Sequence, residues 1–379
     1  MQKKICESIR KTEVSNNRED FRMSFLKKCA AFLLAGVMTL SCAACAADTT
    51  WIMKKGELEM PAGVYLNNLM QSYFEATMEV EDPSKDVLKQ TIDGKDASEW
   101  IKEQALNATK ESMALCDKFN QLGLSFSEQE LATCQTQAKS YYEQSGDNLE
   151  KNGISQNSIE LLYQITYMKT KVFDAIYGEG GEQEVSEQEM RDYYNENYIK
   201  MAVQTFSFPA EPQLTEDMSE EEKAAQQEMY DMQRGNTYSS AENLFLQGQI
   251  GRDAGKDWNE VLNQYKKDNS GEEEYDMTTN NYRLLDTATT PLDKEVVTAL
   301  KEAEQGEMVK VETDTMIAVG ATTDINADPT DFEYVQSAIR HALKDEEFSQ
   351  MLLEMAADES FEINQDAVDR YQPKKLVVE

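Results

Sequence analysis

The side chains that could carry acid–base or metal chemistry include a single histidine, His341. One imidazole cannot supply a metal site with several histidine ligands or a pair of imidazoles for proton transfer, and a Ser-His-Asp arrangement would have to use His341 alone. The residues around His341 have the spacing of a C-terminal helix, on which we expect it to be exposed. The sequence therefore predicts no catalytic residue, no metal and no cofactor.

Acidic side chains are the second candidates, because the chain contains 71 Asp and Glu residues. Asp324, Asn326 and Asp328 have the spacing that begins a calcium-binding loop. However, Pro329 stands where that loop needs glycine, and Val335 stands where it needs glutamate. The remaining acidic runs are typical of a solvated surface.

Two cysteines near the N-terminus have a different chemistry, lipid attachment. Between Lys28 and Asp48 no residue is charged, and an apolar stretch followed by small residues leads to Cys42 and Cys45. This order is typical of a bacterial export signal, so Met23 is the expected start. Either Cys42 or Cys45 is the predicted site of lipid attachment, with ordinary cleavage or a retained membrane helix as alternatives. Every alternative places the rest of the chain outside the cytoplasm.

Two further cysteines, Cys116 and Cys134, follow the export segment. They fall in successive predicted helices and could face each other, and export would permit a disulfide between them. Two buried free thiols are the alternative, because free cysteine behaves as a small apolar residue.

The formal charge of −34 at pH 7 limits the possible partners. Proteins that follow a phosphate backbone need basic patches, so this composition argues against a nucleic-acid partner. Strong negative charge is typical of a surface protein that stays soluble.

The predicted fold class is α+β, with the helices first. Apolar residues at helical spacing predict four helices before a glycine-rich boundary at residues 178–181. Short β-prone segments then alternate with helices at 201–208, 282–285, 308–311 and 316–319. A last helix, from about residue 332 to 355, is expected to pack back on the N-terminal helices.

We expect four divisions of the chain. They are an export segment at 1–47, of which 1–22 precede the expected start, a helical domain at 48–182, an α+β domain at 183–325, and a C-terminal helix and tail at 326–379. The stretch 210–235 is acidic and rich in glutamine, which predicts a solvated loop and an exposed helix capped by Ser219 and Glu222.

Three phrases in the second half of the chain form a recognisable order. They are VSEQEM at 185–190 with two tyrosines after it, GKDWNEV at 255–261, and GEMVKVET at 306–313. Their arrangement resembles the PrsA/SurA group of extracytoplasmic foldases over most of the chain after the export segment. The resemblance implies a mainly helical, SurA-N-like chaperone domain and a parvulin-like peptidyl-prolyl isomerase domain.

The sequence departs from that family where its catalytic histidines would lie. Thr205 stands in the position of the first histidine, and Met316 stands near the second, in a segment where Asp314-Thr315-Met316 replaces Gly-Tyr-His. We therefore expect a degenerate parvulin-like domain with weak or no isomerase activity. An apolar, desolvating cleft would still permit some isomerisation without acid or base groups.

These observations predict a foldase or holdase, lipid-anchored on the extracytoplasmic face of the bacterial cell membrane, that binds unfolded or nascent secreted proteins. The 19 methionines support this prediction if some of them line a surface that repacks against varied apolar segments; otherwise they fill helical cores. The alternative is an envelope lipoprotein that binds one dedicated protein partner or ligand.

Overall fold

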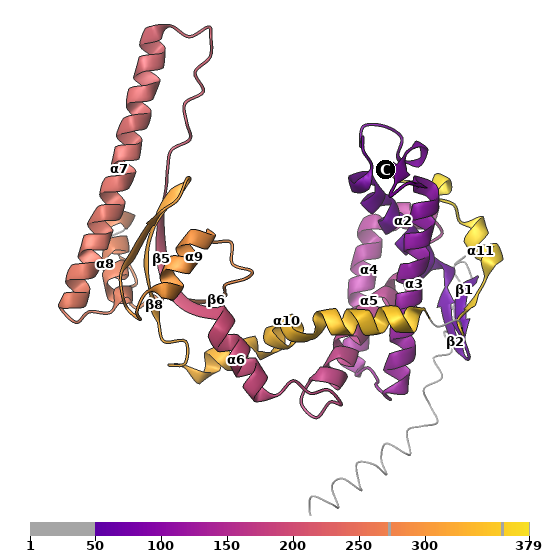
Figure 1. Ribbon diagram of the computed structural model, residues 1–379. Helices are drawn as coiled ribbons and strands as arrows, with labels where there is room; N and C mark the ends of the chain where they lie inside the picture. Colours follow the sequence, from indigo (N-terminus) through magenta and orange to yellow (C-terminus); the bar gives the residue numbers. More distant parts are fainter. Residues whose placement is uncertain (1–49, 272–273, 358–359, 379) are drawn as a thin grey trace, which may run out of the picture. The chain divides into compact units, whose positions relative to one another are not determined.

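The computed structural model describes residues 50–271, 274–357 and 360–378. The predicted export segment, with Cys42 and Cys45, lies outside the described residues. The described chain is α+β, as predicted, with long helices and small antiparallel sheets (Figure 1). In this part of the chain no helix combines the length and the hydrophobicity needed to cross a membrane.

The first elements form a hairpin to which the end of the chain is joined. Strands β1 (Trp51–Lys55) and β2 (Leu58–Pro61) are antiparallel, and β9 (Glu362–Ile363) pairs with the other side of β1. The Asn364 side chain donates to the Trp51 carbonyl at 3.0 Å. Further along, the Val377 amide donates to Asn152 Oδ1 at 2.8 Å. The C-terminal tail thus belongs to the N-terminal part of the fold.

Four long helices follow the hairpin: α2 (Ala62–Glu79), α3 (Ala97–Gln121), α4 (Glu128–Lys151) and α5 (Gln156–Tyr177). Between α2 and α3 lie the 3-10 turn η1 (Val87–Lys89) and the short strands β3 (Thr91–Ile92) and β4 (Lys95–Asp96). Ser127 and Glu130 form a capping box at the start of α4, since the Ser127 hydroxyl accepts from the Glu130 amide while the Glu130 carboxylate accepts from the Ser127 amide.

Helix α10 (Pro329–Ala356) packs against α3, α5 and α6 (Glu187–Asn197), which confirms that the C-terminal helix returns to the N-terminal helices. Phe348 on α10 is buried, and its ring lies 5.4 Å from that of Phe173. After β9 come α11 (Gln365–Arg370) and the 3-10 turn η2 (Pro373–Lys375). We call β1 to α6 together with α10 and the tail the helical body.

The remaining elements form a four-stranded antiparallel sheet in the order β6-β5-β8-β7. Its strands are β5 (Tyr198–Ser207), β6 (Arg283–Asp286), β7 (Val309–Glu312) and β8 (Met316–Thr323), and its helices are α7 (Glu220–Asp253), α8 (Trp258–Ser270) and α9 (Lys294–Glu302). We call residues 198–323 the sheet domain. Side chains from α7 and α8 pack on one face of the sheet and side chains from α9 on the other.

Helix α7 differs from the prediction. The sequence predicts a solvated loop and an exposed helix within residues 210–235, whereas the structure has one helix of 34 residues that begins at the predicted capping box of Ser219 and Glu222 and continues to Asp253. Its buried residues, Ala241, Leu244, Gly248 and Gly251, all lie in its second half. Figure 1 shows the first half extending beyond the strands.

Candidate functional site

The structure brings the two predicted degenerate positions onto one face of the sheet. In the register of β5 and β8, Thr205 lies opposite Ala318 and Ser207 lies opposite Met316. Residues directly opposite in an antiparallel pair point to the same face, and so do residues two apart on one strand. Thr205 and Met316 are therefore diagonal neighbours on the face that α9 covers further along the strands.

This face offers contact but no proton transfer. Along β5 it carries Ile199, Met201, Val203, Thr205 and Ser207, none of which ionises near neutral pH. Thr205 is exposed and Met316 is half-buried, so the apolar cluster under α9 ends in an accessible, uncharged stretch. Such a surface can bind an apolar or amide-rich segment of a polypeptide. The surface has no general acid or base that could act on the bound segment.

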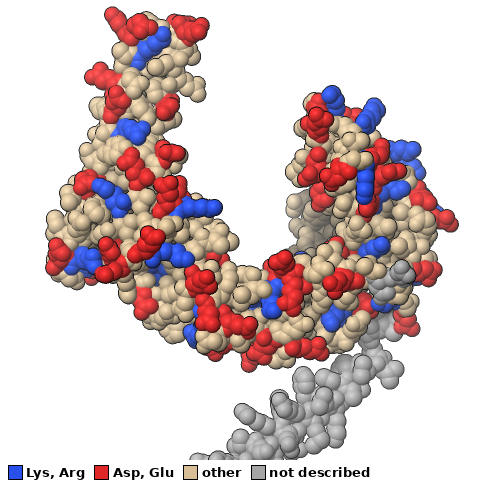
Figure 2. All heavy atoms as spheres, viewed as in Figure 1, with Lys and Arg blue, Asp and Glu red and all other residues tan. Residues whose placement is uncertain are grey.

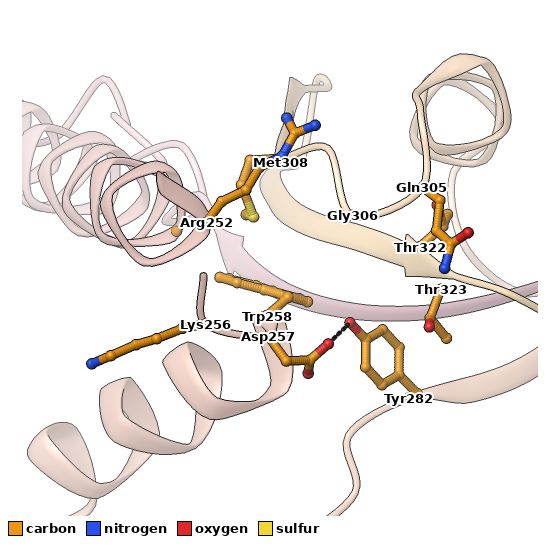
Figure 3. Close-up of a pocket in the computed structure, with 11 residues that line it drawn as sticks. Arg252, Lys256, Asp257, Trp258, Tyr282, Gln305, Gly306, Met308, Thr322 and Thr323 are labelled. Carbon is orange, nitrogen blue, oxygen red and sulfur yellow. Dashed lines mark hydrogen bonds between the residues drawn. The ribbon is translucent and has the colours of Figure 1, made fainter. Parts of the chain in front are cut away.

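A cavity of about 300 Å³ opens on the side of the sheet that α7 and α8 cover (Figure 3). It lies where the end of α7, the start of α8, the turn before β7 and the end of β8 meet. Its lining residues are Gly248, Arg252, Lys256, Asp257, Trp258, Tyr282, Gln305, Gly306, Met308, Thr322 and Thr323. We call it the α7–α8 pocket.

The floor of the α7–α8 pocket is fixed by tight packing. Trp258 is buried, and its Nε1 donates to the Ala202 carbonyl at 2.8 Å, which ties α8 to the sheet. A Cβ on Gly248 would lie 2.7 Å from the terminal carbon of Met308, so a larger residue there would displace that side chain. The present arrangement of the apolar floor therefore depends on a residue without a side chain.

Polar groups surround this floor. The Asp257 carboxylate caps α8 by accepting from the Asn259 amide at 2.7 Å, and it also accepts from the Tyr282 hydroxyl at 3.3 Å. Burial, and then the nearby Asp257 charge, raise the pKa of Tyr282, so its hydroxyl stays a neutral donor. The side chains of Arg252 and Lys256 make no ion pair or hydrogen bond with another described residue. The pocket can thus hold a small group with acceptor oxygens.

An asparagine network positions Tyr282. Asn263 is fully buried on α8, and its amide nitrogen donates to the Thr279 carbonyl at 2.8 Å. Asn281 donates to Asn259 Oδ1 at 2.8 Å. The loop before β6 is therefore held against α8, and sequence reasoning missed this network because its members lie in two separate segments.

A second cavity, of about 410 Å³, lies between α7 and the edge strand β7. Its charged groups are already paired, since Lys310 binds Glu242 and the Tyr238 hydroxyl donates to Glu312. It offers fewer free polar groups to a ligand than the α7–α8 pocket does.

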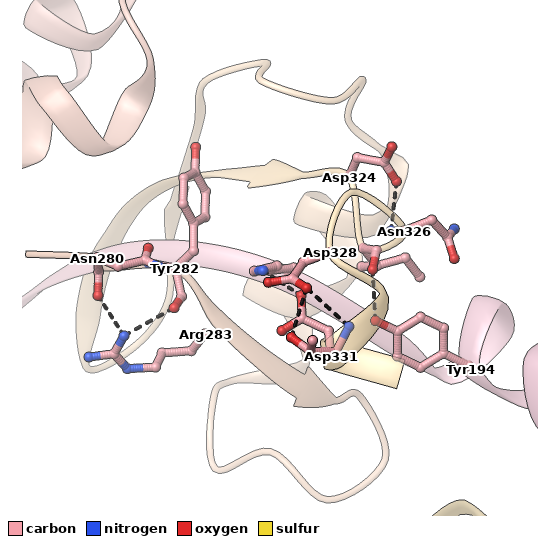
Figure 4. Close-up of polar contacts among 11 residues, drawn as sticks. Tyr194, Asn280, Tyr282, Arg283, Asp324, Asn326, Asp328 and Asp331 are labelled. Atoms are coloured by element: carbon pink, nitrogen blue, oxygen red, sulfur yellow. Dashed lines mark hydrogen bonds and ion pairs between the residues drawn. The ribbon is translucent and has the colours of Figure 1, made fainter. Parts of the chain in front are cut away.

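The residues that imitate a calcium loop have other partners, as Figure 4 shows. Asp324 accepts from the Asn326 amide at 2.8 Å, and Asp328 caps α10 by accepting from the Thr330 amide at 3.0 Å. Nearby, the Tyr194 hydroxyl donates to the Ile325 carbonyl at 2.8 Å, and burial raises the pKa of Tyr194 to about 12. Within the described residues no group of three or more His, Cys, Asp or Glu side chains could hold a metal ion.

His341 is half-buried rather than exposed, which corrects the prediction. Its ring stacks on Phe173, with centroids 4.0 Å apart and planes at 12°, because α10 lies on α5. Its Nδ1 lies 2.8 Å from Asp345 Oδ1. His341 thus packs between two helices of the helical body, whereas Thr205 and Met316 lie in the sheet domain.

Cys116 and Cys134 are buried and carry free thiols in the structure, the second of the two alternatives. Burial raises the pKa of the Cys116 thiol to about 12, so it stays protonated and unreactive. Their helices do not pack chiefly on each other: α3 packs chiefly on α2, and α4 packs chiefly on α5.

No protein-family model and no curated protein matches the chain. The solved structures that it resembles are foldases and peptidyl-prolyl isomerases. Among them is the foldase protein PrsA of Lactococcus lactis, at 11% identity and a TM-score of 0.36, covering 84% of this chain and 96% of that one. PrsA of Streptococcus pneumoniae shows 12% identity and a TM-score of 0.36, covering 77% and 98%. The peptidylprolyl isomerase PrsA of Bacillus anthracis shows 18% identity and a TM-score of 0.25, covering 66% and 95%.

Proposed function

We propose that this protein is an extracytoplasmic foldase or holdase, lipid-anchored through Cys42 or Cys45, that binds unfolded secreted polypeptides. In this proposal its sheet domain is a parvulin-like binding module with weak or no prolyl isomerase activity. The observation that carries the proposal is the stretch of the sheet face around Thr205 and Met316, which is accessible and has no group for proton transfer; the charged Arg283 lies on the same face, opposite Met201.

Exposed apolar side chains elsewhere also support polypeptide binding. Large apolar residues normally lie inside a protein, and flexible methionines on a surface can adapt to varied segments. In the described chain the exposed large apolar residues include Phe74, Met78, Leu214, Met277, Leu343 and Leu353. Two of them are methionines, the type of residue that suits a surface with many different partners.

A protease-coupled assay on an Xaa-Pro peptide tests the enzymatic part. We expect turnover close to the uncatalysed rate, because the twisted amide would be favoured only by contact with an apolar face. Turnover comparable to that of an active parvulin measured in parallel would refute the assignment of a degenerate site.

Suppression of aggregation tests the binding part. The full chain should suppress aggregation of several unrelated denatured proteins at stoichiometric amounts. Thr205→Glu should weaken this suppression, because it places a charge on the apolar face. Gln204→Glu is the matched control, since the adjacent residue points to the opposite face of β5. Absence of suppression by the unmodified chain would favour the dedicated binder over the chaperone.

The lipid anchor is tested separately by labelling cells with a radioactive fatty acid. Cys42→Ser and Cys45→Ser each remove one candidate sulfur. Loss of label in one variant identifies the attachment site, and label retained when both cysteines are replaced would contradict lipid anchoring there.

A further inference from the structure

Helix α7 carries an exposed, uncharged stripe along its outer side. The stripe consists of residues spaced alternately by four and by three, namely Ala225, Met229, Met232, Asn236, Ser239, Asn243, Leu246 and Ile250. At 100° per residue they lie within an arc of about 100°, and they extend over about 38 Å of helix. This alternation is that of the a and d positions of a coiled coil. We call these residues the outer stripe.

Apart from Ser239, which also lines the cavity between α7 and β7, the outer stripe is not used by the fold of the described chain. The core of the sheet domain is contacted instead by Ala241, Leu244, Gly248 and Gly251, on another side of the same helix. All residues of the outer stripe are exposed, including Met232 at 61% and Ile250 at 68%. Apolar side chains at the seam positions of a helix normally pack against a second surface, and the described chain provides no such surface for the apolar residues of the outer stripe.

The order of residue types in the outer stripe is nearly symmetric about Ser239. Two apolar residues, Met229 and Met232, precede Asn236, and two apolar residues, Leu246 and Ile250, follow Asn243. A surface whose pattern reads the same in both directions is complementary to a second copy of itself turned by 180°. We propose that α7 pairs with α7 of a second copy of this chain, antiparallel, along the outer stripe.

The proposed register matches the levels of the seam to within one residue. It places Met229 next to Ile250 and Met232 next to Leu246 of the second copy, so apolar side chains meet at both ends. Asn236 lies opposite Asn243, where each amide can donate to the other, as asparagines in seam positions do when they fix the register. Ser239 lies opposite its own equivalent, on the two-fold axis.

The charges beside the outer stripe also fit an antiparallel pair. Half of its flanking positions are glutamine, and in this register Glu228 lies near Gln249 while Glu242 lies near Gly235, so no two carboxylates face each other. Figure 2 shows acidic side chains gathered at the free end of α7, where the first turn holds Glu220 to Glu222. A parallel pair would bring these acidic turns together, whereas an antiparallel pair separates them by the length of the seam.

Sedimentation equilibrium of the full chain tests the pairing. We expect a concentration-dependent dimer, and Met232→Glu should raise its dissociation constant by about tenfold or more, because a charge enters an apolar seam. Gln227→Glu is the matched control, since it adds the same charge to an exposed position of α7 outside the outer stripe. A chain that remains monomeric at about 0.1 mM, or a dimer that Met232→Glu leaves unchanged, would overturn the proposal.

Cysteine crosslinking tests the register. Under mild oxidation Ser239→Cys should give a covalent dimer, because the two sulfurs meet on the two-fold axis. Met229→Cys alone should give none, whereas Met229→Cys combined with Ile250→Cys should. The parent chain, whose described cysteines are buried, shows the background. A crosslink through Met229→Cys alone would indicate a parallel pair and contradict the antiparallel register, and circular dichroism of each variant verifies that the helices remain.

Discussion

The helical body and the sheet domain both contain long helices, but the two regions stabilise them differently. Helix α3 has 25 residues and α5 has 22, and nine residues of each are buried. Helix α7 has 34 residues, of which only four are buried. The longest helix of the described chain therefore buries fewer residues than the shorter helices α3 and α5. Capping and local side-chain pairs favour the start of such a helix, but tertiary contacts normally supply most of its stability. The exposed apolar residues of the outer stripe are therefore the reason for which we propose a partner for α7.

The largest expected effect lies in the helical body. Phe348→Ala removes a buried ring that contacts Phe173 and Tyr177, and it should lower the free energy of unfolding by about 3–5 kcal/mol. Denaturant titration followed by circular dichroism measures this loss. Tyr334→Ala on the same helix is the control, because Tyr334 is 87% exposed and its loss should change stability by less than about 0.5 kcal/mol. Equal losses in both variants would show that this core does not hold the helical body.

Two glycines of α7 should respond in opposite directions. A Cβ on Gly251 would lie 2.4 Å from Val261 Cγ2, so Gly251→Ala should destabilise the sheet domain by about 1–3 kcal/mol. Gly235 has open space around it, so Gly235→Ala should stabilise the helix by up to about 1 kcal/mol. Thermal unfolding compares the two variants. The same sign for both would mean that the two halves of α7 do not differ in packing.

Matched capping boxes sharpen the comparison further. Ser219→Ala on α7 and Ser127→Ala on α4 each remove one cap, which is worth about 1 kcal/mol. In α4 the loss should appear in global unfolding, because that helix packs on α5. In α7 it should appear as faster amide hydrogen exchange confined to the first turns, with little change in global stability. Faster exchange throughout the sheet domain after Ser219→Ala would contradict this separation.

The smallest expected effect concerns pH. A hydrogen bond from Lys171, with those from Ser127, lowers the pKa of Glu130 from 4.5 to about 2. Because the folded pKa lies below the unfolded one, Glu130 stabilises the fold above about pH 4.5, and this contribution is lost as the pH falls towards 2. Glu130→Gln should flatten the acid limb of a plot of stability against pH. If the acid limb is unchanged in this variant, carboxylates other than Glu130 cause the loss of stability at low pH.

The parts of this fold that the sequence predicted are those with local signals. The capping boxes at Ser127 and Ser219 and the strand that became β5 follow from residue types within a few positions of each other. The continuity of α7 could not be predicted in the same way, because its acidic, glutamine-rich half lacks a buried face. The two-residue strand β9 is too short to show any periodicity, and only its pairing with β1 defines it.

The candidate site was predictable as a pair of positions but not as a surface. Family resemblance indicated Thr205 and Met316, whereas their place on one face depends on the register of β5 and β8, which no local pattern sets. The α7–α8 pocket was missed because its lining residues come from separate segments of the sequence, among them Trp258, Tyr282 and Thr323. A single residue of one of these types cannot be recognised from the sequence as part of a pocket, because the pocket exists only in the folded structure.

The joining of the chain's two ends determines when this protein can finish folding. Strand β1 acquires its second neighbour only when β9 is present, and the amide and carbonyl of Val377 both bond to the side chain of Asn152. A chain is synthesised from its N-terminal end, so β1 and α4 must wait for the last residues before these contacts close. The sheet domain is complete at Thr323 and contains only contacts between nearer segments. During synthesis the sheet domain would therefore fold before the helical body, whose two parts lie on either side of it in the sequence.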